Sequence, residues 1–173
     1  MIQIDEASAS DAAAIEQLLD QRFGPARRAR TAYRLRDGVA PIAPLCVVAR
    51  DAGALIGSAQ CWPLRVRGVD GTRVPLVLLG PVAVALSHER LGLGSALTWA
   101  ALARADAGGF APQLLIGDLE FYGRFGFAAG AGDDWHLPGP VDRARLLLRG
   151  DTSGLPRLGW LEAGTPQRGR AAA

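Results

Sequence analysis

The most constraining feature of the sequence is the apolar run at residues 74–84, which is too rich in Val and Leu to have one face in water. Such a run is typical of a strand buried on both faces, so it predicts a central strand of a sheet. Gly80-Pro81 interrupts the run, and proline has no amide hydrogen for a regular ladder. We therefore predict a bulge or a splayed strand at this point.

Periodic patterns predict further elements on both sides of this run. The first elements are a strand around Ile2 and Ile4 and a helix from the Ser8-x-x-Asp11 start signal to the Gly24-Pro25 stop. A basic segment at 27–36 follows and is compatible with a short helix. Next comes a hairpin of strands 45–50 and 55–66, the second of which is broken or edged at Pro63. After the apolar run come a helix at 92–107, a buried strand at 113–116, a short helix from Asp118 to Tyr122 or Arg124, a strand opening at Gly126-Phe127 and a last strand at 144–148. This order indicates an α+β fold whose sheet has a mixed centre.

The length and composition are those of a globular protein about one domain long, with 173 residues, 49% of them hydrophobic and 21% charged. We expect a single domain over residues 1–163 and a frayed Gly/Arg/Ala/Pro tail at 164–173. The first residues lack the pattern of a signal peptide, and no stretch approaches the ~18 apolar residues of a membrane helix. These features predict a soluble, cytoplasmic protein without a membrane partner.

Charge and cysteine usage exclude several kinds of chemistry. All 19 residues of the Lys+Arg total are Arg, which excludes a Schiff-base lysine, a phosphate-loop lysine and a lysine general base. The net charge of +2 is nearly balanced, so we expect no nucleic-acid partner. Cys46 and Cys61 lack CxxC spacing and have only His88 and His136 as co-ligands, which argues against a metal site. We interpret both cysteines as buried thiols in a reducing compartment.

Residues 82–97 have the layout of a phosphate site: a strand, a short loop, a Gly-x-Gly turn and a helix. Free backbone amides and the helix dipole favour an anion there, and glycines let the backbone come close to it. The dinucleotide version of this motif fails because the sixth position from Gly92 is Leu97, and the triphosphate version lacks its lysine. On spacing alone, a plain strand-to-helix turn explains the pattern equally well.

Two motifs resemble those of the GCN5-related N-acetyltransferases, the GNAT family. Glu89-Arg90-Leu91-Gly92-Leu93-Gly94 is similar to the family pattern [QR]-x-x-G-x-[GA], although Glu89 replaces the Gln or Arg. Phe121-Tyr122-Gly123-Arg124-Phe125-Gly126-Phe127 resembles the Y-x-x-x-G-F segment, and residues 78–84 with 115–118 resemble one branch of predicted acetyltransferases. Residues 2–15 look like the family's first strand and helix. The resemblance covers most of residues 2–127.

The resemblance implies a GNAT-type fold, with a mixed, mostly antiparallel central sheet, a splayed fourth and fifth strand and flanking helices. It implies acetyl-CoA as co-substrate, no metal, and direct transfer of acetyl to a small-molecule or peptide amine. The oligomeric state stays open, a homodimer included. Tyr122 would protonate the departing thiolate. The expected cofactor-binding residues are Val82, Ala83, Val84, Glu89, Arg90, Leu91, Gly92, Leu93, Gly94 and Ser95. The alternative is a non-catalytic module that binds or senses acyl-CoA, which the mismatch at Glu89 supports.

Several residues keep two interpretations at this stage. Tyr122 could instead pack under Phe125 and Phe127 with its hydroxyl merely satisfied. No general base is assigned, because Asp118 suits a helix cap, Glu120 a solvated position and His88 a loop. The arginines of segment 27–36 could capture an acidic substrate or form a solvated helical surface, and with Tyr33 as the only aromatic residue among them, RNA binding is a minor alternative.

Overall fold

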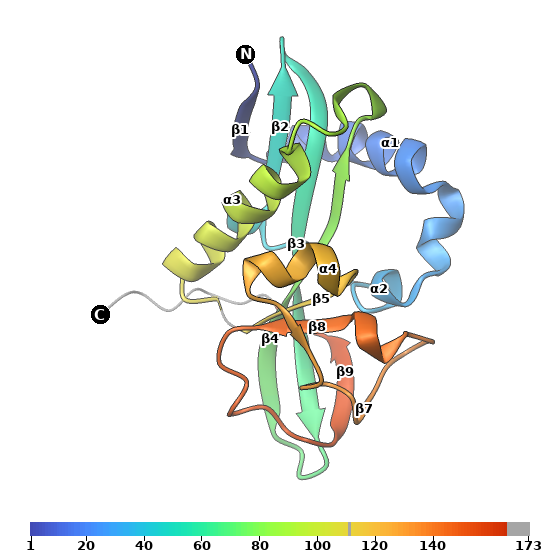
Figure 1. The fold of residues 1–173 in the computed structure, drawn as a ribbon. Coiled ribbons are helices and arrows are strands. Elements are labelled where there is room, and N and C mark those ends of the chain that lie inside the picture. Colours follow the sequence, from blue (N-terminus) through green and yellow to red (C-terminus); the bar gives the residue numbers. More distant parts are fainter. Residues whose placement is uncertain (111, 166–173) are drawn as a thin grey trace.

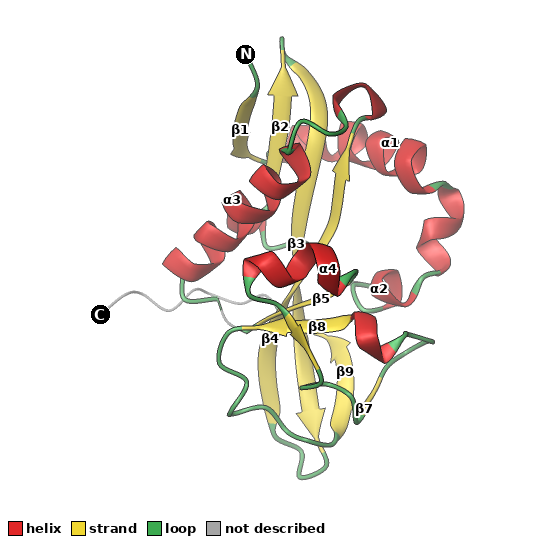
Figure 2. Ribbon diagram, viewed as in Figure 1, coloured by secondary structure: helices red, strands yellow, loops and turns green. Residues whose placement is uncertain are grey.

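The computed structural model describes residues 1–110 and 112–165. In this part of the chain nine strands form one sheet, in the order β1-β2-β3-β4-β5-β8-β6, with β9 beside β3 and β7 beside β9 (Figure 1). The strands are β1 (Gln3–Glu6), β2 (Val47–Asp51), β3 (Ala54–Gly68), β4 (Arg73–Val84), β5 (Gln113–Ile116), β6 (Ala128–Ala129), β7 (Trp135–His136), β8 (Leu146–Arg149) and β9 (Gly159–Ala163). The helices are α1 (Ala12–Phe23), α2 (Thr31–Arg34), α3 (Leu93–Ala107) and α4 (Leu119–Tyr122) (Figure 2).

The apolar run forms the central strand β4, as predicted. β4 pairs with β3 in antiparallel and with β5 in parallel orientation, and β7 with β9 is the other parallel pair among the described strands. Opposite Gly80 and Pro81 the register shifts, because Ala59 faces Val82 while Cys61 faces Leu79. This is the predicted bulge, with two residues of β4 opposing Gln60.

The predicted splay is also present, between β4 and β5. Their ladder consists of Val77 with Gln113 and Leu78 with Leu114. Beyond Leu78, β4 continues to Val84 with β3 alone at its side, while β5 turns to pair with β8. The fold is therefore a mixed, mostly antiparallel sheet with flanking helices, as expected.

Of the two outcomes predicted at Pro63, a broken strand or an edge position, the structure shows the edge position. β3 runs without interruption from Ala54 to Gly68, and Pro63 stays in register with Val77 of β4. On the other edge of β3, pairing with β2 ends at Ala59 and pairing with β9 begins at Leu64. Pro63 lies between these two neighbours, where its missing amide hydrogen interrupts no ladder.

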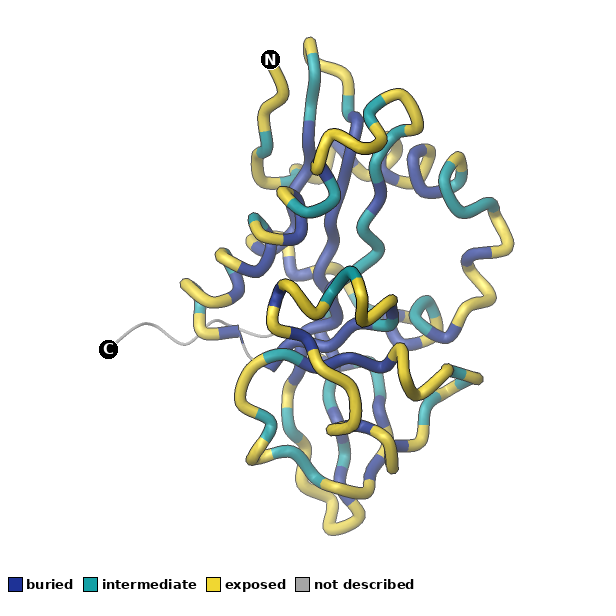
Figure 3. Tube along the Cα trace, viewed as in Figure 1, coloured by how far each residue is buried: buried dark blue, intermediate teal, exposed yellow. Residues whose placement is uncertain are grey.

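Helices cover both faces of the sheet because neighbouring strand residues point in opposite directions. Val48 packs with α1 through Ile15, Leu18 and Leu19. Val47 and Ala49 on the same strand pack in the cluster that contains α3. Figure 3 shows the result, a buried middle of the sheet between helices whose outward faces are exposed. Among the described residues, no helix is long and apolar enough to cross a membrane.

The basic segment differs from the single short helix that the sequence suggested. A 3-10 turn at Pro25–Ala29 and the helix α2 are separated by Arg30, whose backbone is extended with φ −69° and ψ 149°. Five arginines of this segment are divided by exposure: Arg27 and Arg36 are buried, whereas Arg28, Arg30 and Arg34 are exposed. The segment is therefore neither a uniformly solvated surface nor a buried helix.

The C-terminal part of the sheet extends further than predicted. The strand expected at 144–148 is β8, and β9 follows it on the free edge of β3. Gly164, expected in the frayed tail, is buried, and its amide donates to the carbonyl oxygen of Pro63 at 2.9 Å. Residues 166–173 of that tail lie outside the described residues.

Candidate active site

A cavity of about 860 Å³ lies where β4 and β5 separate. Its wall consists of residues 78–82 of β4, residues 115–118 and Tyr122, residues 29–34 with Arg36 and Phe23, and residues 140–142 with Arg145. Since β4 beyond Leu78 pairs with β3 alone, the backbone groups on its other edge have no neighbouring strand among the described residues. The sequence predicted the splay, but not the segment 140–145 that closes the cavity.

Tyr122 reaches this cavity from the last residue of α4. Its ring packs on Gly117, where an added Cβ would lie 2.6 Å from Cε2, so this position requires glycine. The ring also packs edge-on against Phe121, with centroids 4.8 Å apart, and against Phe125 at 6.1 Å. Within the described part of the chain, no group forms a hydrogen bond with the Tyr122 hydroxyl. The aromatic packing of the alternative interpretation is therefore present, and the choice between the two roles of Tyr122 stays a prediction.

The surroundings keep the Tyr122 hydroxyl protonated. Burial raises its pKa above the ordinary value, the carboxylate of Asp118 raises it further, and the cation of Arg145 opposes this. Asp118 and Arg145 form an ion pair of 3.1 Å at the same wall. A phenol in this setting can donate a proton to a developing anion, but is a poor base.

The start of α3 has the geometry of an anion site. Gly92 precedes the helix in the left-handed conformation, with φ 72°, and no side chain caps this end. The amides of Leu93, Gly94 and Ser95 thus have no partner within the described residues. A Cβ on Gly94 would make one ordinary contact, 3.9 Å from Cγ2 of Val84, so the protein itself leaves this position open. The Leu93 side chain, in contrast, is buried in the core.

Glu89 is neutralised by an arginine of another element. Its carboxylate accepts a hydrogen bond from Nη2 of Arg22 on α1, at 2.5 Å. The neighbouring Arg90 has a positive φ of 64°, is exposed, and has no ion pair with any described residue. Arg90 rather than Glu89 is therefore the charged side chain at the turn that is free to meet an anion.

Of the three base candidates, Asp118 alone lines the cavity. It stands at the N-cap of α4, yet its side chain pairs with Arg145 instead of capping the helix. Glu120 is exposed and outside the cavity wall. His88 lies in the loop before α3, with Nδ1 2.8 Å from Oγ of Ser87. The geometry thus assigns no general base.

The cysteines are not part of this site. Cys46 and Cys61 are free and buried, and burial raises the pKa of both thiols. The described residues contain no group of three or more His, Cys, Asp or Glu side chains that could hold a metal ion.

The comparison with protein families identifies the fold. A family model described as "Acetyltransferase (GNAT) domain" matches residues 3–130, about three quarters of the chain. The chain belongs to the GNAT acetyltransferase family. The resemblance seen in the Gly-x-Gly and Y-x-x-x-G-F segments is thereby confirmed at the level of the family. No curated protein matches this GNAT chain.

Solved structures of other GNAT proteins agree with this assignment. The N-acetyltransferase YhbS from Escherichia coli, solved in complex with CoA, is 27% identical with a TM-score of 0.74, and the match covers 94% of this chain and 89% of that one. An acetyltransferase from Brucella melitensis in complex with acetyl-CoA is 23% identical, TM-score 0.56, over 88% and 97% of the two chains. Arabidopsis thaliana Naa50, in complex with the bisubstrate analogue CoA-Ac-MVNAL, is 16% identical, TM-score 0.55, over 85% and 96%. The last two show the likeness of fold alone.

Proposed function

We propose that this GNAT protein is an acetyl-CoA-dependent N-acetyltransferase that transfers acetyl directly to an amine. The observation that carries the proposal is the cavity between β4 and β5, where Tyr122 and the unpaired edge of β4 meet. The buried, unpaired cysteines also suit a protein of the reducing cytoplasm.

The residues of this chain fit acetyl-CoA. The amides of Leu93, Gly94 and Ser95 and the side chain of Arg90 would hold the phosphates, since the turn is open and uncapped. The backbone edge of Val82–Val84 would hold the pantetheine arm by hydrogen bonds of the kind another strand would otherwise make. Glu89 opposes phosphate binding less than an isolated carboxylate would, because Arg22 pairs with it.

The acetyl group arrives as a thioester, which supplies an activated carbonyl and a thiolate leaving group. Tyr122 holds the proton that this thiolate requires, and its raised pKa keeps the proton in place until charge develops. Apolar side chains in the wall, among them Leu79, Leu115 and Val141, disfavour an ammonium and so favour the neutral amine that attacks. The amine nitrogen bonds to the carbonyl carbon as the C–S bond breaks, the thiolate takes the Tyr122 proton, and the proton lost by the nitrogen restores the Tyr122 hydroxyl through water. Transfer through this cavity therefore requires no covalent enzyme intermediate.

A CoA-release assay over a panel of amines tests the proposal, compared between the wild type and Tyr122→Phe. The variant loses one hydroxyl and keeps the packed ring, so turnover should fall about 10²-fold or more while acetyl-CoA affinity hardly changes. Unchanged turnover would assign Tyr122 a packing role. Gly94→Val serves as the binding control, because the apo protein has room for the side chain but a bound phosphate does not.

The alternative, a non-catalytic acyl-CoA module, rests on Glu89 at the position where the family pattern has Gln or Arg. It predicts that acetyl-CoA binds, by calorimetry, and that no amine in the panel releases CoA. Binding lost in Gly94→Val together with turnover lost in Tyr122→Phe would exclude it.

A further inference from the structure

The cavity wall contains a buried arginine with no carboxylate partner. Arg36 follows α2 and is 8% exposed, and its guanidinium lies between two aromatic rings, 3.7 Å from the centroid of Tyr33 and 4.5 Å from that of Trp62. Its Nη1 atom has no hydrogen-bond partner, and none of the described carboxylates pairs with it. Burial lowers its pKa below the ordinary value, and the hydroxyl of Tyr33 and the more distant carboxylate of Glu16 offset only part of this effect. A buried charge left in this state is costly, so it calls for an explanation.

The other charges of the wall do not supply the missing anion. Asp118 pairs with Arg145, and the Asp142 carboxylate accepts the backbone amide of Ala144 at 3.0 Å. Two further arginines, Arg30 and Arg34, line the cavity without an ion pair to any described residue. The α2 side of the cavity therefore carries unpaired positive charge, whereas Asp118 pairs with Arg145 and Asp142 is an exposed carboxylate on the opposite segment.

Unpartnered polar atoms continue from Arg36 along β3. Oγ of Ser58, Oε1 of Gln60 and Nε1 of Trp62 are buried without a hydrogen-bond partner. These residues alternate along the strand and so share one face, the face of Val48, which is in register with Ser58 and packs on α1. Buried polar atoms are nearly always bonded in native proteins, so these atoms call for a partner, but Arg36 is the residue of this group that lines the cavity itself.

We propose that the acceptor of this acetyltransferase is an amine that also carries a carboxylate, and that Arg36 binds this carboxylate in the cavity. The inference rests on the proposed function. An arginine offers parallel N–H groups that match the two oxygens of a carboxylate, and the rings of Tyr33 and Trp62 hold the guanidinium plane in position before the ligand arrives. The amine would then lie toward Tyr122, in the same cavity.

The test compares amines that differ in the carboxylate alone. Glycine, β-alanine, γ-aminobutyrate and ε-aminocaproate are each assayed against the alkylamine of the same chain length. We expect at least one carboxylate of the series to be preferred about 10- to 100-fold in kcat/KM, the range of a charge-assisted hydrogen bond. Arg36→Met should remove this preference, so that kcat/KM for each amino acid falls to that of its matched alkylamine. Arg28→Met, at an exposed arginine outside the cavity wall, should retain the preference.

A binding measurement separates this inference from the proposed function. The N-acetyl derivatives of the same four amino acids and their carboxamides are titrated calorimetrically in the presence of CoA. Carboxylates that bind more tightly than carboxamides in the wild type but not in Arg36→Met support the inference, even if no amine is turned over. Equal binding of the two sets, no binding of either, or a preference that survives in Arg36→Met overturns it. Weaker CoA binding by Arg36→Met also overturns it, because the guanidinium would then serve the phosphates of CoA.

Discussion

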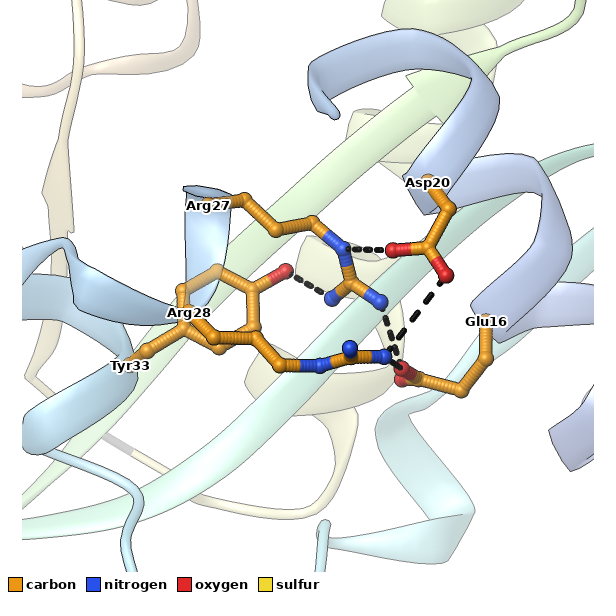
Figure 4. A network of polar contacts seen from close by, with 5 residues as sticks. All are labelled: Glu16, Asp20, Arg27, Arg28 and Tyr33. Atoms are coloured by element: carbon orange, nitrogen blue, oxygen red, sulfur yellow. Dashed lines mark hydrogen bonds and ion pairs between the residues drawn. The ribbon is translucent and has the colours of Figure 1, made fainter. Parts of the chain in front are cut away.

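Two buried arginines of the same basic segment have opposite surroundings. The Arg27 side chain is fully buried and donates to Glu16 at 2.5 Å, to Asp20 at 2.9 Å and to the hydroxyl of Tyr33 (Figure 4). Arg36 contacts the face of the same Tyr33 ring but has no carboxylate among the described residues. Burial would lower the pKa of Arg27, yet its hydrogen bonds outweigh burial and raise it, whereas the pKa of Arg36 is lowered.

The difference separates a structural cation from one available to a ligand. Arg27 joins the 3-10 turn at Pro25–Ala29 to α1, because both of its carboxylate partners lie on that helix. Its charge is compensated in the protein alone. Arg36 lies in the cavity wall, where Tyr33 and Glu16 offset only part of its burial and a bound anion would supply the rest. Partners, and not burial, therefore decide which arginine supports the fold and which is available for function.

Arg27→Met should have the largest effect on folding. The substitution removes three hydrogen bonds of a buried cation, but Glu16 and Asp20 are partly exposed and regain water, so we expect a loss of about 2 kcal/mol in the free energy of unfolding. For a chain of this size that lowers Tm by about 4 to 8 °C. Thermal unfolding followed by circular dichroism measures it. A change in Tm below about 1 °C would mean that the hydrogen bonds of Arg27 do not stabilise the fold, and that Arg27 is not the structural arginine of the pair.

Tyr33→Phe tests the residue that the two arginines share. The variant removes the hydroxyl that accepts a hydrogen bond from Arg27 and weakly supports the charge of Arg36, and it keeps the ring against Arg36. Leaving a buried charged donor unsatisfied should cost about 1 to 1.5 kcal/mol, or about 2 to 6 °C in Tm. Carboxylate preference in the acetylation assay should not change. A lost carboxylate preference with an unchanged Tm would mean that the Tyr33 hydroxyl serves Arg36 and the cavity rather than Arg27 and the fold.

Arg36→Met should change stability less than either of these, by no more than about 1 kcal/mol in either direction. Loss of stacking on Tyr33 and Trp62 is offset by relief from burying an unpaired charge. The same substitution at Arg27 is the matched comparison in thermal unfolding. A loss as large as that of Arg27→Met would show that Arg36 is also structural, and that its compensation comes from within the protein.

The sequence could not distinguish these two arginines, although it predicted much of the fold around them. Apolar periodicity and Gly-Pro interruptions located the central strand and its bulge, because those signals are local. β9 was missed because Leu161 is the only large buried side chain of a five-residue strand. Gly92 was marked by the spacing of its turn and Tyr122 by the resemblance to the family, and their roles stay predictions. The partners of an arginine come from distant segments that meet only in the fold.

The smallest effect on stability is expected for Glu16, one of the two carboxylates that pair with Arg27. Burial would raise the pKa of Glu16, but hydrogen bonds from Arg27 and Arg28 outweigh it, so the pKa lies below its ordinary value. A carboxyl whose pKa is lower in the folded state stabilises the fold above its unfolded pKa of about 4.3. This contribution disappears as pH falls through the folded pKa, because protonation then occurs in both states. Stability that depends on Glu16 is therefore present at pH 7 and lost in acid.

Glu16→Gln isolates the contribution that the charge of Glu16 makes to stability. Since the Glu16 side chain is about half exposed, with 48% of its surface accessible, we expect the variant to be less stable by only about 0.5 kcal/mol at pH 7. Urea unfolding of both proteins should show this gap unchanged from pH 8 to pH 5 and closing below about pH 4. Glu120→Gln is the control, because Glu120 is exposed and has no ion pair with a described residue, and its gap should be near zero throughout. A Glu16→Gln gap that persists at pH 3 would mean that the carboxyl acts through packing rather than charge, and that Arg27 depends mainly on Asp20 and Tyr33.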